Sequence, residues 1–224
     1  MIDLFTWGTL NSRKISIMLE ETGLAYRVHL VDIGAGEQHE PDFLAISPNN
    51  KVPAIVDHEL DGGPRKIFES GAILIYLAEK TGRLLPNAGV GRTDVLQWLM
   101  WQMSGLGPMF GQYYHFARMA KDEIPYAIDR FDQEMQRLLT VMNTRLGEAP
   151  YLGGNYSIAD IAAFDWVRNT RKLRDDELDW SRFPHIDRWL EDVGARPAVQ
   201  RGMRVPSDRE PYQRKRGEAT SAGD

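Results

Sequence analysis

One short segment combines an acidic side chain with a helix start, and this combination can bind a zwitterion. Phe68 ends an apolar stretch, Glu69 follows, and a helical pattern begins with Ser70 as its N-cap. The free N–H groups and the positive end of a helix dipole attract a carboxylate, while Glu69 offers a partner for an ammonium group. Together they match the head group of an α-amino acid. The alternative is that Ser70 only caps its own helix and Glu69 is a solvated acid.

A second segment, Ser47-Pro-Asn-Asn-Lys-Val-Pro53, places a proline immediately before a predicted strand over 54–57. Only about 5–6 % of X–Pro bonds in folded proteins are cis, but the place of Pro53 in the order of elements favours a cis Val52–Pro53 bond. Such a turn would present the Val52 N–H and C=O to an extended peptide, which could pair with them as a strand does. The alternative is an ordinary proline at the start of a strand.

The rest of the sequence excludes several kinds of chemistry. It contains no cysteine, which rules out disulfides, thiolate metal sites and a cysteine nucleophile. Its five histidines include no pair at the short helical spacing of a zinc site. Phosphate-binding glycine motifs and a Gly-x-Ser-x-Gly nucleophile segment are also missing. We therefore expect neither a metal nor a nucleotide, and any reactive sulfur must come from a ligand.

Charge and hydropathy narrow the class of protein further. The 224 residues carry 27 basic and 32 acidic side chains, which give a formal net charge of −5. This balance argues against nucleic acid as a partner, because phosphates are bound by basic surfaces. No apolar run approaches the roughly 20 residues that span a bilayer, so no membrane partner is expected. The chain starts at once with a strand-like pattern instead of a basic leader, and we expect a cytoplasmic protein.

The elements that would carry the two segments alternate between strands and helices in residues 1–81. Their order is βαβ, a short helix and then ββα, which predicts an α/β domain with a mixed four-stranded sheet. Gly23 marks the end of the first helix, and a turn at 61–64 separates the last two strands. The predicted strands cover 2–6, 26–31, 54–57 and 66–68, and the predicted helices cover 12–22, 42–46 and 70–81.

The remainder of the chain is almost entirely helical in pattern. A segment rich in glycine, 82–91, is expected to be a linker, and an all-helical domain is expected over 92–204. Residues 205–224, which combine prolines with mixed charges, are expected to form a flexible tail.

Three long helices are expected in this second part. The first two cover about 93–119 and 125–146, and the second has one continuous apolar face. The third begins at Ser157, whose side chain can cap the helix while Asp160 reaches back to the cap.

Three motifs together resemble the glutathione transferase superfamily. They are Ser47-Pro-Asn-Asn-Lys-Val-Pro53, Phe68-Glu-Ser-Gly-Ala72 and Ser157-Ile-Ala-Asp160. The resemblance covers residues 1 to about 204. More narrowly, the bacterial nu class and its fungal relatives are similar at Thr9-x-Asn11, Gly34-Ala-Gly-Glu-Gln38 and Gly105–Phe116. The resemblance implies a thioredoxin-like N-terminal domain, an all-α C-terminal domain, a homodimer and glutathione as cosubstrate.

The same resemblance implies roles in glutathione binding. Val52, before Pro53, would pair with the cysteinyl backbone, and Glu69 with Ser70 would hold the γ-glutamyl end. The resemblance also implies roles for residues around the ligand, namely Gln38 and Lys51 as flanking side chains and Arg130 as a side chain from the partner subunit. Arg130 could equally be a solvated helix arginine.

A pocket for the second substrate is expected on the helical domain. The aromatic residues expected near it are Tyr113, Tyr114, Phe116 and Trp166. Each of them could instead belong to the helical core.

Activation of the glutathione thiol is expected at the start of the first helix. Many family members have Tyr, Ser or Cys there, whereas this chain has Thr9 and Asn11. Lowering the pKa of a thiol from about 8.5 by about two units needs roughly 2.7 kcal/mol. A hydrogen bond to a charged acceptor contributes about 1.5–3 kcal/mol and a helix N-terminus about 0.3–1 kcal/mol. The Thr9 hydroxyl and an Asn11 amide or backbone N–H therefore suffice together with the helix start, and both residues can also act as helix caps.

Three functions stay open at this point. Because the chain has no cysteine, glutathione must be the attacking thiol, and the nu-class resemblance favours the reduction of small or glutathionyl disulfides. Conjugation of glutathione to an electrophile is the close alternative. A non-catalytic regulatory module that binds glutathione is the third, since a fold does not fix a function. The complete set of binding motifs favours an enzyme.

Overall fold

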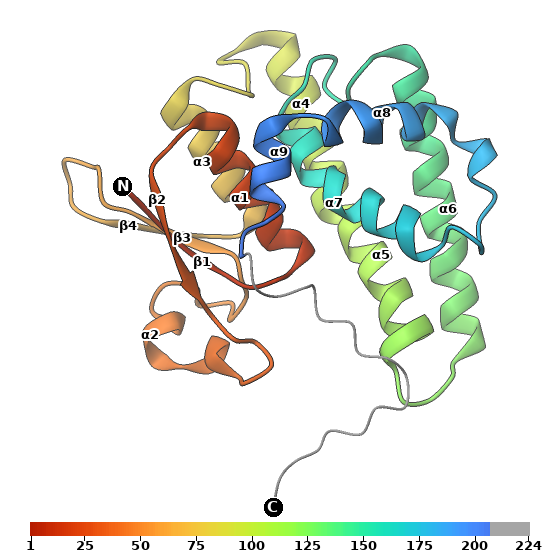
Figure 1. Ribbon diagram of the computed structural model, residues 1–224, viewed down its shortest axis with the longest axis horizontal. Helices are drawn as coiled ribbons and strands as arrows, with labels where there is room; N and C mark the ends of the chain where they lie inside the picture. The colour runs from red at the N-terminus through yellow and green to blue at the C-terminus, as the bar shows by residue number, and fades with distance from the viewer. Residues whose placement is uncertain (207–224) are drawn as a thin grey trace, which may run out of the picture.

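The computed structural model describes residues 1–206. A sheet with its helices occupies one side of the molecule in Figure 1, and a bundle of helices occupies the other. Residues 207–224, which hold most of the expected tail, lie outside the described part of the chain. No helix within residues 1–206 is long and apolar enough to cross a membrane.

The sheet has four strands in the order β2-β1-β3-β4. β1 (Ile2–Thr6) pairs in parallel with β2 (Tyr26–Leu30) and antiparallel with β3 (Ala54–Asp57). β3 in turn pairs antiparallel with β4 (Arg65–Phe68). The mixed four-stranded sheet predicted from the sequence is therefore confirmed, with small differences at the ends of two strands.

Helices cover both faces of the sheet because strand residues alternate between the two faces. On one face, Ile2 and Leu4 join a core cluster with α1 (Leu10–Thr22) and α3 (Ser70–Thr81). On the other face, Phe43 of α2 (Pro41–Leu44) packs in a smaller cluster. A short 3-10 helix, η1 (Glu37–His39), precedes α2.

The helical domain begins with one continuous run of helix from residue 89 to residue 119. Its parts are α4 (Gly89–Trp101), a π-helical segment (Gln102–Leu106), α5 (Gly107–Tyr114) and a second π-helical segment (His115–Met119). The helix starts inside the segment 82–91 that the sequence predicts as a linker. The helix expected over about 93–119 is confirmed, and it contains two π-helical segments, the first of them where Pro108 has no N–H to donate to the carbonyl of residue 104.

The remaining elements complete the helical domain. They are α6 (Pro125–Glu148), α7 (Ile158–Leu173), a 3-10 turn η4 (Trp180–Arg182), α8 (Pro184–Gly194) and α9 (Pro197–Gly202). α9 returns to the first domain, where Ser16 Oγ of α1 donates a hydrogen bond of 2.8 Å to the Gly202 carbonyl. The two halves of the chain are thus packed directly on each other.

The predicted cap of α7 is confirmed. The Ala159 N–H donates to Ser157 Oγ at 3.3 Å, and the Ser157 N–H donates to Asp160 Oδ2 at 3.0 Å. Asp160 Oδ1 also accepts from Leu152 N–H and Trp189 Nε1, at 3.0 and 2.9 Å. Burial raises the pKa of Asp160 to about 6, although these hydrogen bonds act in the opposite direction. This carboxyl group therefore links α7 to α8 inside the core.

Candidate active site

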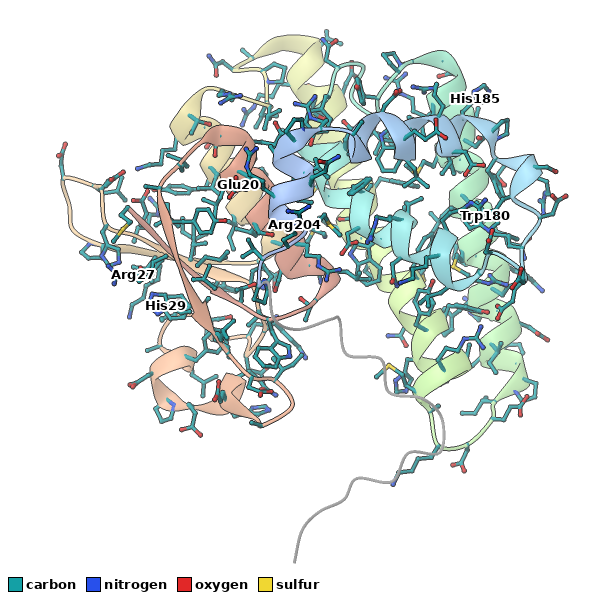
Figure 2. All side chains as sticks on the ribbon, viewed as in Figure 1. Glu20, Arg27, His29, Trp180, His185 and Arg204 are labelled. Carbon is teal, nitrogen blue, oxygen red and sulfur yellow. The ribbon has the colours of Figure 1, made fainter. Side chains whose placement is uncertain are left out.

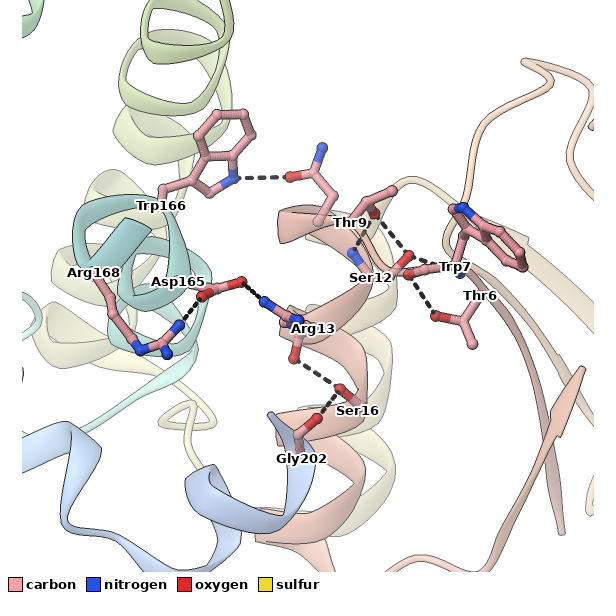
Figure 3. A network of polar contacts seen from close by, with 11 residues as sticks. Thr6, Trp7, Thr9, Ser12, Arg13, Ser16, Asp165, Trp166, Arg168 and Gly202 are labelled. Carbon is pink, nitrogen blue, oxygen red and sulfur yellow. Dashed lines mark hydrogen bonds and ion pairs between the residues drawn. The ribbon is translucent and has the colours of Figure 1, made fainter. Parts of the chain in front are cut away.

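Thr9 is the N-cap of α1, as Figure 3 shows. Its Oγ1 accepts a hydrogen bond from the Ser12 N–H at 3.1 Å and donates one to Ser12 Oγ at 2.9 Å. A hydroxyl group has a single proton to donate. The Thr9 proton is therefore used inside the cap in this structure.

Asn11 lies on α1, two residues after Thr9, where the two domains meet. Trp166 of α7 donates from Nε1 to Asn11 Oδ1 at 3.0 Å, which is a contact across 155 positions of sequence. Within residues 1–206 the Asn11 amide NH₂ has no hydrogen-bond partner. The indole is itself confined, since a Cβ atom built on Gly107 or Gly111 would lie 3.6 Å from its ring. The amide group is therefore fixed with its donors free.

The N-terminus of α3 differs from the prediction in one respect. Glu69 is the N-cap residue, with φ of 69°, and Ser70 is already the first residue of the helix. The expectation that Ser70 caps α3 is wrong, because its side chain is buried and faces Lys14 and Met103. The first intrahelical bond runs from Ile73 N–H to the Glu69 carbonyl at 2.9 Å. The N–H groups at 70–72 precede that bond and are available to an anion.

The loop before β3 joins the parts of the site. Asn49 Nδ2 donates to Glu69 Oε1 at 3.1 Å, and Asn50 Nδ2 lies 3.3 Å from Nδ1 of His39 in η1. Sequence analysis gave Asn49 and Asn50 no role, although both belong to the quoted motif. Their amides hold the loop between η1 and the start of α3.

The same loop carries the Val52–Pro53 peptide bond, which is cis. Ser47 Oγ donates to the Lys51 carbonyl at 2.8 Å and steadies the turn. No hydrogen bond within residues 1–206 uses the Val52 N–H or C=O. Both groups are therefore open to pairing with an extended ligand, as the sequence predicts.

Gln38 and Lys51 are the two side chains predicted to flank the ligand, and they come from η1 and from the loop before β3. Gln38 lies on η1, and its Oε1 is buried with no hydrogen-bond partner within the described chain. Lys51 is exposed at the loop. The contact between Asn50 and His39 ties these two segments together.

The other predicted residues do not all meet this site within one subunit. Arg130 is exposed near the start of α6. Tyr113 is 4 % exposed, with its hydroxyl 3.4 Å from Glu177 Oε2, and contributes to the helical core. Tyr114, the last residue of α5, and Phe116, in the second π-helical segment, are half-buried, whereas Trp166 reaches α1 directly.

A buried lysine beside the site escaped the sequence analysis. Lys14 is 2 % exposed, and its Nζ lies 3.5 Å from Ser70 Oγ and 2.8 Å from Gln102 Oε1. Its only sequence signal is a charged residue inside an otherwise well-buried stretch of α1, which a helical pattern alone does not distinguish from an exposed lysine. Lys14 therefore connects α1, α3 and the first π-helical segment.

Metal ligands are not grouped anywhere in the described chain. His29 on β2 and His185 on α8 lie at opposite sides of the molecule in Figure 2. Within residues 1–206 no group of three or more His, Asp or Glu side chains could hold a metal ion.

Family models match both parts of the chain. The model for the glutathione S-transferase N-terminal domain matches residues 2–79, and the model for the C-terminal domain matches residues 125–192. Among curated relatives, the disulfide-bond oxidoreductase YfcG of Escherichia coli strain K12 is 52 % identical over 206 residues. That alignment covers 91 % of this chain and 94 % of the relative. The disulfide-bond oxidoreductase YghU of the same strain is 39 % identical, covering 100 % and 81 %.

Solved structures agree in fold and sequence. A glutathione transferase from Burkholderia graminis, solved with two glutathione molecules bound per subunit, aligns with a TM-score of 0.86 and 45 % identity. The alignment covers 93 % of this chain and 89 % of that one. A glutathione transferase from Pseudomonas putida, solved with one glutathione disulfide per subunit, gives a TM-score of 0.85 and 44 % identity, with coverage of 92 % and 91 %. The chain belongs to the glutathione S-transferase family, as its thioredoxin-like and all-helical halves and its sequence relatives show.

Proposed function

We propose that this glutathione-dependent enzyme reduces small disulfides, with the glutathione thiolate as the attacking nucleophile. The chain has no cysteine, so it cannot form a mixed disulfide of its own with the substrate. Two relatives that match most of the chain are named disulfide-bond oxidoreductases. A structural neighbour was solved with glutathione disulfide bound and another with two glutathione molecules per subunit. These findings favour a site that holds two glutathione sulfurs close together.

Glutathione would lie across the segments that the loop before β3 brings together. The free backbone groups of Val52 would pair with the cysteinyl residue. The N–H groups at the start of α3 would bind the γ-glutamyl carboxylate, and Glu69 would bind the ammonium group. In this pose the thiol points toward the start of α1. Gln38 and Lys51 would flank the peptide.

The observation that carries the proposal is the fixed amide of Asn11. Its oxygen is held by Trp166 Nε1 at 3.0 Å, so its NH₂ faces away from the indole. A thiolate placed at the start of α1 could accept a hydrogen bond from that amide. The proton of Thr9 is engaged with Ser12 Oγ at 2.9 Å. We therefore assign thiolate stabilisation to Asn11 and support of the helix start to Thr9.

The reaction consists of two exchanges of the same kind. The bound thiolate attacks one sulfur of the disulfide RSSR, which forms the S–S bond of GSSR and releases RS⁻. A second glutathione thiolate then attacks the glutathione sulfur of GSSR, which forms GSSG and releases the second RS⁻. Each released thiolate takes the proton that one glutathione thiol had lost. Two glutathione molecules are oxidised for each disulfide reduced.

The proposal extends to the assembly. We infer a homodimer in which Arg130 contacts the glutathione of the partner subunit. This is consistent with its exposure on α6, where its guanidinium group acts on Glu134 only at longer range than an ion pair. Phe116, stacked on Phe131 with ring centroids 5.7 Å apart, and Tyr114 would border the second-substrate pocket with Trp166.

Product stoichiometry tests the reaction. With hydroxyethyl disulfide as substrate, we expect one GSSG and two mercaptoethanol molecules for every disulfide consumed. Intact-mass spectrometry during turnover should show no covalent adduct on the protein. Accumulation of a stable glutathione conjugate from an electrophile, with no GSSG from the disulfide, would replace this proposal with conjugation.

A further inference from the structure

Lys14 is a buried amine without a carboxylate partner. It is 2 % exposed on α1. Its Nζ lies 2.8 Å from Gln102 Oε1, 3.4 Å from Met103 Sδ and 3.5 Å from Ser70 Oγ. All three contacts are with uncharged groups, and no carboxylate within residues 1–206 lies at ion-pair distance from this nitrogen. A buried ammonium group in such surroundings lacks a counter-ion.

The first π-helical segment produces this arrangement. It carries both Gln102 and Met103, and it brings them against the start of α3, where a Cβ atom built on Gly71 would lie 3.1 Å from Met103 Cγ. π-Helical segments of this kind are frequent at functional sites. The helical domain therefore closes the space behind the proposed γ-glutamyl subsite.

Several charged groups on the elements that pack against α1 are already paired. Asp165 of α7 pairs with Arg13 at 3.3 Å and with Arg168 at 3.1 Å. Both ion pairs are drawn in Figure 3. On the side of α1 that faces α9, Glu20 pairs with Arg201 of α9, and Glu21 pairs with Arg196, the residue before α9. From α3, Glu69 acts on Lys14 at longer range than an ion pair.

The pKa of the Lys14 ammonium group lies close to neutral pH. Burial lowers the pKa of its ammonium group to about 7, and the negative charge of Glu69 offsets part of this effect. Unpaired buried charges are costly unless a partner of opposite charge is supplied. The amine thus loses its proton near neutral pH in the ligand-free protein.

We propose that the counter-ion of Lys14 is the free carboxylate of the γ-glutamyl residue, reached through the Ser70 hydroxyl. The inference rests on the function proposed above, which places this carboxylate at the start of α3. Lys14 donates to Ser70 Oγ, which leaves the Ser70 proton for the ligand. That proton now points at Met103 Sδ at 3.7 Å, a weak acceptor that a carboxylate replaces. Lys14 is therefore a positioning residue, and glutathione binding draws a proton onto it.

The pH dependence follows from linkage. A bound carboxylate raises the pKa of Lys14 above its ligand-free value of about 7, so the complex binds more protons than the free protein between the two values. Affinity is therefore greatest below pH 7 and falls as the pH rises. If only the protonated form binds well, Kd increases several-fold from pH 6.5 to pH 8, and most of one proton is taken up at pH 8.

Titration calorimetry with S-methylglutathione tests this inference, because that ligand has no ionisable thiol. Heats measured in two buffers of different ionisation enthalpy give the number of protons taken up. We expect uptake of most of one proton at pH 8 and a Kd that rises several-fold between pH 6.5 and pH 8. This measurement uses the unmodified protein and does not depend on the folding of a variant.

A pair of variants assigns the proton to its site. Lys14→Met keeps an unbranched side chain in the same space without the amine, and it should abolish both the proton uptake and the pH dependence of Kd. Lys172→Met, on the exposed side of α7, should leave both as they are in the unmodified protein.

Two results overturn the inference alone. One is S-methylglutathione binding with no proton uptake and a constant Kd from pH 6.5 to pH 8, which leaves the proposed function standing. The other is proton uptake that persists in a folded Lys14→Met variant. A complete lack of S-methylglutathione binding at every pH overturns the proposed function itself, and the inference with it.

Discussion

Replacing Asn11 by alanine removes the amide that Trp166 holds at the start of α1. The change takes away the acceptor of the 3.0 Å bond from Trp166 Nε1 and the NH₂ donors that this bond orients. It leaves the cap of α1 intact, because that cap consists of Thr9 and Ser12. The substitution therefore isolates one of the two side chains to which the sequence assigns thiol activation.

The size of the expected change in the thiol pKa follows from the loss of one hydrogen bond to the thiolate. A hydrogen bond to a charged acceptor contributes about 1.5–3 kcal/mol, and one pKa unit corresponds to about 1.36 kcal/mol. The pKa of the bound thiol should therefore rise by about one to two units in Asn11→Ala. The turnover rate at neutral pH should fall by less than the thiolate fraction does, because a thiolate of higher pKa is intrinsically more nucleophilic.

The pKa is best measured directly, by the ultraviolet absorbance of the bound thiolate as a function of pH. The complex with S-methylglutathione supplies the background spectrum. Thr9→Val is the matched control, and we expect it to destabilise α1 by about 1 kcal/mol while the thiol pKa moves much less. An unchanged pKa in Asn11→Ala together with a large rise in Thr9→Val would refute the assignment to Asn11.

Three further predictions concern binding and stability. Glu69→Gln removes the partner of the ligand ammonium group, so the Kd for S-methylglutathione should rise about tenfold to a hundredfold, and an unaltered calorimetric Kd would reject the ligand pose. Ser157→Ala should lower the free energy of unfolding by about 1 kcal/mol in denaturant titrations without changing that Kd. Asp57 is buried, which acts to raise its pKa, but bonds such as that from Lys80 at 2.8 Å outweigh burial and lower the pKa below 3.8. The contribution of Asp57 to stability is therefore full above pH 4 and is lost as the pH falls through the lowered pKa. Lys80→Met should make the free energy of unfolding less dependent on pH below pH 4.

Local sequence patterns predicted much of the fold. The alternation of the strands, the left-handed Gly23 at the end of α1 and the reciprocal cap between Ser157 and Asp160 depend on residues close together in the chain. The open backbone at Val52 and the acidic residue at the start of α3 followed from short motifs in the same way. These features were predictable because neighbouring residues determine them.

Features that depend on distant packing were not predictable. The bond between Asn11 and Trp166 joins residues 155 positions apart. The buried position of Lys14 depends on the π-helical segment that carries Gln102, and no helical periodicity reports such a segment. The inward turn of Ser70, which moves the cap to Glu69, likewise depends on this packing from the helical domain.

The most direct test of the central claim compares two reactions of the same purified protein with glutathione. One assay follows the reduction of hydroxyethyl disulfide, and the other follows conjugation to a chloronitrobenzene. The proposed disulfide reduction predicts a kcat/KM for the disulfide that is larger by orders of magnitude. A larger kcat/KM for the chloronitrobenzene would contradict the account.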